Sequence, residues 1–198
     1  MGVFLNLFMW QMRYLETLLK SGKTVFTYEM LGFFLQIANR DTLKSLIQRL
    51  VKSWVLQRLH HGIYALPHYE IFEFATLLQK RSYISLETVL KKEAIIFQDY
   101  GTRIFLMWEK TEEKTALGRQ FECHKIKDGI LYNPIGVIQT GSYAIATAER
   151  AVCDRLYLSP NYYFDNLEPL NLEKLLEIAE NYSSRVFLSV KKLLTHAR

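Results

Sequence analysis

Residues 42–66 constrain the fold more than any other stretch of the chain. From Leu43 onward, apolar residues recur at helical spacing and form one buried stripe, whose members are Leu43, Leu46, Ile47, Leu50, Val51 and Trp54. Asn39 or Asp41 can cap the start of this helix. The segments 55–59 and 63–66 follow directly as two short strands, and Gly62 between them suits a tight turn. A helix followed at once by a small hairpin predicts a winged helix-turn-helix at the N-terminal end.

The face of this helix opposite the stripe is polar and basic. Its side chains can reach phosphates and base edges if the helix enters a major groove. In the predicted hairpin, Gln57 and the basic or titratable residues beside the turn are expected to be exposed. The candidate DNA-binding residues are Arg40, Thr42, Lys44, Ser45, Gln48, Arg49 and Lys52 in the helix, and Arg58, His60 and His61 in the hairpin.

Two further helices are expected before it. One ends at Ser21-Gly22 and buries Tyr14, Leu15, Leu18 and Leu19, and a second runs from Tyr28 to about Gln36 with Thr27 as its cap. The short connection 37–39 favours the angled packing of a helix-turn-helix. Residues 1–11 are apolar and uncharged but too few to span a bilayer, so we expect a helical extension that packs on the body or on a second chain.

The net charge is located in this N-terminal region. Residues 12–66 hold eight basic side chains against three acidic ones, whereas residues 67–198 hold 17 of each. A local basic surplus is typical of a surface that binds polyanions, although surface lysines often serve only solvation. The chain length and an apolar content of 49% indicate folded domains, and we predict a boundary at Pro67, with domains at 1–67 and 68–198.

The second domain is predicted to be mixed α+β. Helices are expected near residues 69–80 and from Ser85, strands at 103–108, 120–126 and 136–140, a turn at Asp128-Gly129, and further helices at 147–158, 172–182 and 185–196. The fold class of the whole chain is therefore α+β, with a winged helix-turn-helix domain followed by a mixed domain.

A compact polar motif begins the helix at 147–158 and consists of Thr147, Glu149, Arg150 and Asp154. Thr147 suits an N-cap, and Arg150 with Asp154 forms an i,i+4 pair that is weak when exposed and fixes the helix on the sheet when buried. Architecture is favoured over catalysis because no base with an orienting partner accompanies the motif. No nucleotide-binding or hydrolase motif is present, and no cofactor, metal site or enzymatic activity is expected.

The cysteines and histidines do not suggest another site. Cys123 and Cys153 are far apart and form no CxxC pair, which favours free thiols in a reducing cytoplasm. His60 and His61 adjoin on a turn without a cluster of further ligands, so metal binding is disfavoured. Most of the aromatic residues lie in apolar runs that are typical of a core.

Several segments resemble one family. They are S-G-K-T-V-F-T, L-x-x-L-I-x-R-L-V-K-x-W-x-L-x-R-L-x-x-G-x-Y-A-L, Y-I-S-L-E-T-V-L and I-A-T-A-E-R-A-V-C-D. The resemblance as a whole covers roughly residues 12–158. The chain is similar to the AbiEi-type antitoxins of bacterial abortive-infection toxin-antitoxin systems. Ala148 stands where that family often has proline, which removes only a rigid first-turn residue, and the extension before Met12 is atypical.

The resemblance implies a cytoplasmic autorepressor that binds inverted repeats of duplex DNA in its own promoter. We expect it to bind either as a homodimer or as two monomers placed by the DNA. The resemblance further implies a second domain that counteracts a nucleotidyltransferase-like toxin, directly or indirectly. The alternative is a winged-helix transcription regulator unrelated to a toxin, whose second domain senses a ligand or partner. A third reading is an enzyme that uses Glu149, Arg150 and Asp154.

Overall fold

The computed structural model describes the backbone of residues 2–196 and the side chains of residues 9–195. Its fold class is mixed α+β, as predicted. The chain divides into two compact units, Met1–Leu77 and Leu78–Arg198. The side chains of most of the predicted extension, residues 1–8, lie outside the described part.

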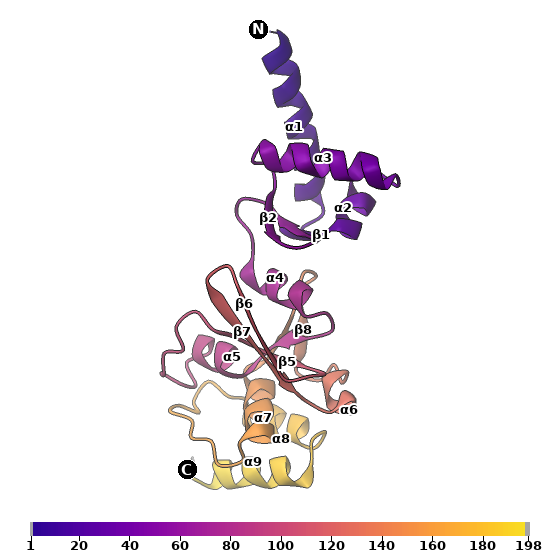
Figure 1. The fold of residues 1–198 in the computed structure, drawn as a ribbon. Coiled ribbons are helices and arrows are strands. Elements are labelled where there is room, and N and C mark those ends of the chain that lie inside the picture. Colours follow the sequence, from indigo (N-terminus) through magenta and orange to yellow (C-terminus); the bar gives the residue numbers. More distant parts are fainter. Residues whose placement is uncertain (1, 197–198) are drawn as a thin grey trace. The chain divides into compact units, whose positions relative to one another are not determined.

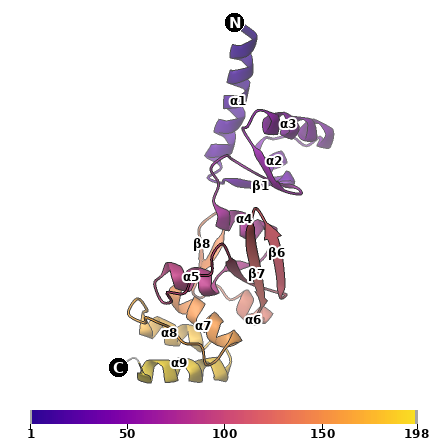
Figure 2. The same ribbon diagram turned by 60° about the vertical axis from the view of Figure 1, so that its left-hand side comes forward.

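The first unit contains α1 (Gly2–Lys20), β1 (Val25–Thr27), α2 (Tyr28–Phe34), α3 (Arg40–Lys52), β2 (Gln57–His60), β3 (Ile63–Ala65) and most of α4 (Ile71–Leu78). Its three strands form an antiparallel sheet in the order β1-β3-β2. Figures 1 and 2 show α1 extending beyond the other elements of this unit. The expected helices and hairpin are present. Strand β1 was not predicted, because a strand of three residues is too short to show a periodic pattern.

The core of the first unit is formed by the apolar stripes of its helices with residues flanking the hairpin. Leu18, Leu31, Leu46 and Leu50 are all buried in this cluster. Two predicted core positions are wrong. Leu19 is 58% exposed because it lies on the outer side of α1, and Trp54 is 82% exposed because α3 ends at Lys52 and Trp54 takes a left-handed backbone conformation with φ +60°.

The start of α4 belongs to the first unit, beyond the boundary expected at residue 67. One carboxylate oxygen of Glu73, Oε2, accepts hydrogen bonds from both the backbone N–H and the hydroxyl of Thr24, each at 2.8 Å. The Thr24 hydroxyl also accepts a bond from the Glu70 N–H. The unit boundary therefore falls at residues 77 and 78, and the first unit gains two acidic side chains.

The second unit is a six-stranded mixed sheet in the order β6-β7-β5-β4-β9-β8, with helices packed on it. Its elements are β4 (Tyr83–Ile84), α5 (Leu86–Lys92), β5 (Ile104–Trp108), β6 (Glu112–Ala116), β7 (Arg119–Lys125), α6 (Asp128–Leu131), β8 (Val137–Gln139), β9 (Ala144–Ala146), α7 (Ala148–Leu158), α8 (Leu172–Ala179) and α9 (Ser184–His196). The turn expected at Asp128-Gly129 is instead the start of the short helix α6, which buries Ile130 and Leu131.

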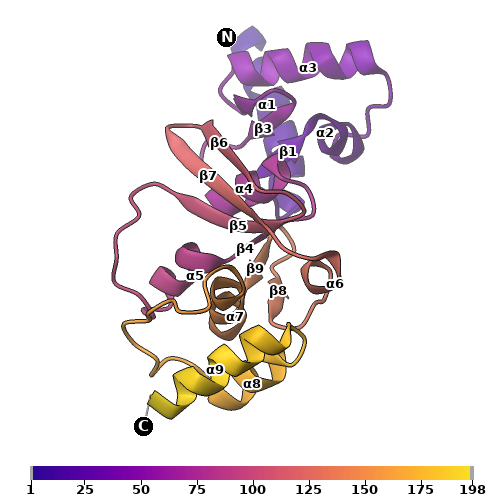
Figure 3. The same ribbon diagram turned by 60° about the horizontal axis from the view of Figure 1, so that its bottom comes forward.

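Helix α7 is the centre of the second unit. It contacts α5, α8, α9 and strand β9. Figure 3 shows α5 and α7 beside the sheet, with α8 and α9 next to α7. Because α7 is enclosed by elements on several sides, polar side chains along it are forced into the interior and require partners there.

Candidate nucleic-acid interface

Helix α3 begins at a capped end and has one clearly buried side. The side-chain oxygen of Asn39 accepts a hydrogen bond from the Thr42 N–H at 3.0 Å, which satisfies a donor that the first turn leaves free. Leu43, Leu46, Ile47 and Leu50 are buried. The other side of the helix therefore faces outward within this unit.

All seven candidate residues of α3 are exposed. They are Arg40, Thr42, Lys44, Ser45, Gln48, Arg49 and Lys52. Four of these seven side chains are permanently cationic near neutral pH, and the remaining three offer hydroxyl or amide groups. The structure thus gathers donors of the kind that bind phosphates and base edges on one helix.

The cations of this face are free of ion pairs. Among the described residues, no salt bridge involves Arg40, Lys44, Arg49 or Lys52. In the second unit, by contrast, many basic side chains pair with acids, including Lys91, Lys92, Arg103, Lys110, Lys114, Arg150, Arg155 and Lys174. The charge of the α3 face is therefore available to an external anion.

The net charge is divided more evenly between the two units than between the sequence segments 12–66 and 67–198. Because α4 brings Glu70 and Glu73 into the first unit, that unit holds eight basic and five acidic side chains, a net charge of +3. Glu73 is buried and bonded to Thr24. What distinguishes the α3 face is consequently that its four cations have no ion pair among the described residues, more than the charge surplus of the unit.

The hairpin β2–β3 presents the remaining candidates. Its strands pair antiparallel, with an irregular register between Arg58 and His60, and Gly62 in the turn has φ +72°. Arg58, His60 and His61 are exposed. The expectation that Gln57 is exposed is wrong, since its half-buried amide donates to the carbonyl of Leu66 at 3.0 Å and thereby closes the base of the hairpin.

The polar motif of α7 has a different environment. The hydroxyl of Thr147 accepts from the Arg150 N–H at 3.3 Å, as expected of an N-cap. Glu149 is buried, accepts from the Asn171 N–H at 3.1 Å and lies 3.7 Å from the Lys174 ammonium. Burial raises the pKa of Glu149, but backbone donors and Lys174 outweigh burial and hold it below its ordinary value.

Arg150 is fully buried and its donors are used internally. Its Nη atoms donate to the carbonyls of Ile130 at 2.7 Å and Ile135 at 2.8 Å, and to the hydroxyl of Tyr83 at 3.0 Å. The guanidinium carbon lies 5.2 Å from the ring centre of Tyr83 and 5.3 Å from that of Tyr182. Burial opposes the charge, but Asp154 and the tyrosines outweigh burial, so the pKa of Arg150 is raised.

Asp154 completes this buried network. The Oδ1 atom of Asp154 lies 3.6 Å from Nε of Arg150. The carboxylate also accepts hydrogen bonds from the hydroxyls of Tyr182 at 2.6 Å, Ser85 at 2.7 Å and Tyr83 at 3.0 Å. Burial raises the pKa of Asp154, and these partners oppose the rise. Burial also raises the pKa of both tyrosines, which keeps their hydroxyls protonated as donors.

This arrangement gives the α7 motif an architectural role. Arg150 and Asp154 have no exposed surface, and each is surrounded by partners from other elements of the same unit. A substrate therefore has no path to either group in this conformation. The buried form of the pair, which fixes α7 on the sheet, is the one that the structure shows.

Three members of the network were not predicted. Tyr83, Ser85 and Tyr182 are distant from Asp154 in the sequence, and the sequence pattern places Ser85 only at the start of a helix, which is α5. The side chain of Ser85 makes no cap hydrogen bond because its hydroxyl is committed to Asp154. The sequence showed an Arg and an Asp among the apolar residues of this helix. Such charges need partners when they are buried, but the sequence pattern does not identify those partners.

Both cysteines are free thiols, and both are buried. Burial raises the pKa of Cys123 to about 11 and moves that of Cys153 upward as well. Neither thiol is thus activated as a nucleophile.

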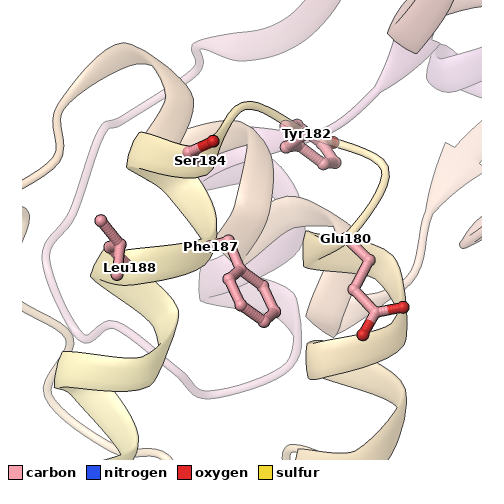
Figure 4. Close-up of a pocket in the computed structure, with 5 residues that line it drawn as sticks. All are labelled: Glu180, Tyr182, Ser184, Phe187 and Leu188. Carbon is pink, nitrogen blue, oxygen red and sulfur yellow. The ribbon is translucent and has the colours of Figure 1, made fainter.

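One shallow pocket lies near the C-terminal end of the second unit. It has a volume of about 420 Å³ and is lined by Glu180, Tyr182, Ser184, Phe187 and Leu188. Figure 4 shows Glu180 beyond the end of α8 beside Phe187 of α9. These five residues include one carboxylate, two hydroxyl groups and no basic side chain.

Two searches of the described residues complete the survey. Within them, no group of three or more His, Cys, Asp and Glu side chains is arranged to hold a metal ion. None of the helices in the described part combines the length and the apolar character needed to cross a bilayer.

No protein-family model matches the chain, and no curated protein matches it.

Proposed function

We propose that the chain is a cytoplasmic, non-enzymatic winged helix-turn-helix protein that binds duplex DNA and represses its own operon. The observation that carries this proposal is the exposed face of α3, whose four cations have no ion pair in the described part of the chain. Phosphate neutralisation with release of counterions rewards such unpaired cations. In this arrangement α3 enters the major groove, and Arg58, His60 and His61 of the hairpin meet the adjacent backbone or minor groove.

We further propose that this repressor is the antitoxin of a toxin-antitoxin pair, with a nucleotidyltransferase-like toxin as its counterpart. This part rests on the resemblance of residues 12–158 to AbiEi-type antitoxins, including the motif around Thr147, Glu149, Arg150 and Asp154. The structural role of Arg150 and Asp154 fits a second unit that acts through its surface. Inverted repeats would be occupied by two copies of the chain, one on each half-site.

A gel-shift titration tests the DNA-binding part. The duplex is the DNA directly upstream of the gene, with unrelated duplex as competitor at physiological salt. We expect competitor-resistant binding that weakens in Lys52→Ala, because each lysine that contacts a phosphate contributes to affinity. The matched control is Lys127→Ala, which removes an exposed lysine from the second unit.

Two outcomes would contradict this proposal. If Lys52→Ala and Lys127→Ala lose the same affinity for the upstream duplex, only the overall charge of the chain matters for binding. If unrelated duplex competes as well as the upstream duplex, the chain has no preference for an operator, and the α3 face is a generic polyanion-binding surface. The antitoxin part has its own test, since co-expression of the chain with a toxin encoded beside it should restore growth, and unrestored growth would reject it.

A further inference from the structure

The side chain of Arg49 in α3 lies over the ring of Trp10 in α1. The guanidinium carbon of Arg49 lies 5.2 Å from the centre of the Trp10 ring. The indole is half-buried and packs against the core cluster of the first unit, and its ring meets Tyr14 edge-on at 5.1 Å. Because these neighbours restrict the indole, it offers Arg49 a surface of fixed position.

Stacking occupies the flat face of a guanidinium and leaves its N–H donors at the edge. Arg49 is exposed, and none of its side-chain donors forms a hydrogen bond or an ion pair with another described residue. Arg49 also lies four residues after Ser45 and three before Lys52, so the three side chains are neighbours on α3. The free donors of Arg49 are thus available beside the other candidates.

We propose that Trp10 is a positioning residue that holds Arg49 ready for a phosphate or a guanine edge of duplex DNA. This inference rests on the proposed function and adds to it the role of a residue in the uncharged segment 1–11. An unrestrained arginine loses rotamer freedom when it binds, whereas a stacked arginine has already lost part of that freedom. The aromatic ring thereby strengthens binding without touching the DNA.

A double-mutant cycle on the full-length chain tests the inference. The dissociation constant for the upstream duplex is measured for the unsubstituted chain, Trp10→Leu, Arg49→Ala and the double variant. We expect Trp10→Leu to weaken binding by about two- to five-fold when Arg49 is present, the usual range for an exposed cation–π contact. In the Arg49→Ala background the same substitution should change nothing further.

Trp10→Phe keeps an aromatic ring in the core and should retain part of the affinity that Trp10→Leu loses. It also serves in the cycle if Trp10→Leu does not fold, which thermal melting of each variant shows. Equal losses from the Trp10 substitution in both backgrounds would mean that Trp10 acts only through the fold, and would overturn the inference.

The failure of the inference can be separated from the failure of the proposed function. If Lys52→Ala weakens binding while Arg49→Ala does not, α3 still binds DNA but the positioning role is rejected. If the unsubstituted chain does not bind the duplex at all, both are rejected.

Discussion

At the scale of single residues, the buried charge of Asp154 is balanced by partners from distant parts of the second unit. We expect Asp154→Ala to lower the free energy of unfolding by about 3–5 kcal/mol, because it leaves Arg150 buried without its counter-charge. Urea denaturation followed by circular dichroism measures the change. Glu177→Ala, an exposed acid of α8, is the control and should stay within about 0.5 kcal/mol. A similar small effect for Asp154→Ala would refute the structural role.

His124 introduces a pH dependence at the same scale. Burial lowers the pKa of His124 below its ordinary value of 6.5, although Glu87 and Glu122 oppose the shift. The folded state therefore binds fewer protons than the unfolded state, so His124 stabilises the fold above pH 6.5 and this contribution is lost as the pH falls through the folded value. The urea midpoint should drop between pH 7.5 and 5.5, and should drop less in His124→Gln. Identical pH profiles would contradict the assignment.

At the scale of elements, the segment before β8 approaches α7 closely at Gly136. This glycine has φ +72°, and a Cβ there would lie 2.9 Å from the Cβ of Arg150. Gly141 has φ +85° but open space around it, so Gly141→Ala isolates the cost of the backbone conformation. Thermal melting should show a larger loss for Gly136→Ala than for Gly141→Ala. Equal losses would mean that contact with α7 contributes nothing.

Elements with a strong apolar period could be predicted, and several of the short strands could not. The stripe indicated α3, and Asn39, one of the two expected caps, is the observed cap, but the helix ends at Lys52, before the last stripe member Trp54. Strand β6 (Glu112–Ala116) contains charged residues and lies at the sheet edge, where pairing with β7 holds it without an apolar side. Strands β1, β4 and β9 have two or three residues each, too few to establish a period.

The candidate site shows the same division. Exposure of the α3 face follows from helical spacing, because burying one side determines the other. The contact of Trp10 with Arg49 and the partners of Asp154 depend on how separate elements pack, which no local pattern records.

At the scale of the whole molecule, the four cations of the α3 face have no ion pair among the described residues, whereas eight basic side chains of the second unit pair with acids. The slope of log affinity against log salt should fall by about two when Lys44 and Lys52 are both replaced by alanine, about 0.9 for each lost phosphate contact. The double variant Lys91→Ala and Lys174→Ala removes ion-paired lysines of the second unit and should leave the slope unchanged. Salt titrations by fluorescence anisotropy measure both, and parallel changes would contradict the division.

The bonds between Glu73 and Thr24 have a practical consequence for dissecting this protein. A fragment ending at residue 67 would lack the carboxylate that accepts the Thr24 N–H, whereas a fragment ending at residue 77 would keep it. A stop codon directly after Pro67 would thus leave the Thr24 N–H, directly before β1, without its acceptor. The shorter fragment is expected to be the more readily proteolysed of the two.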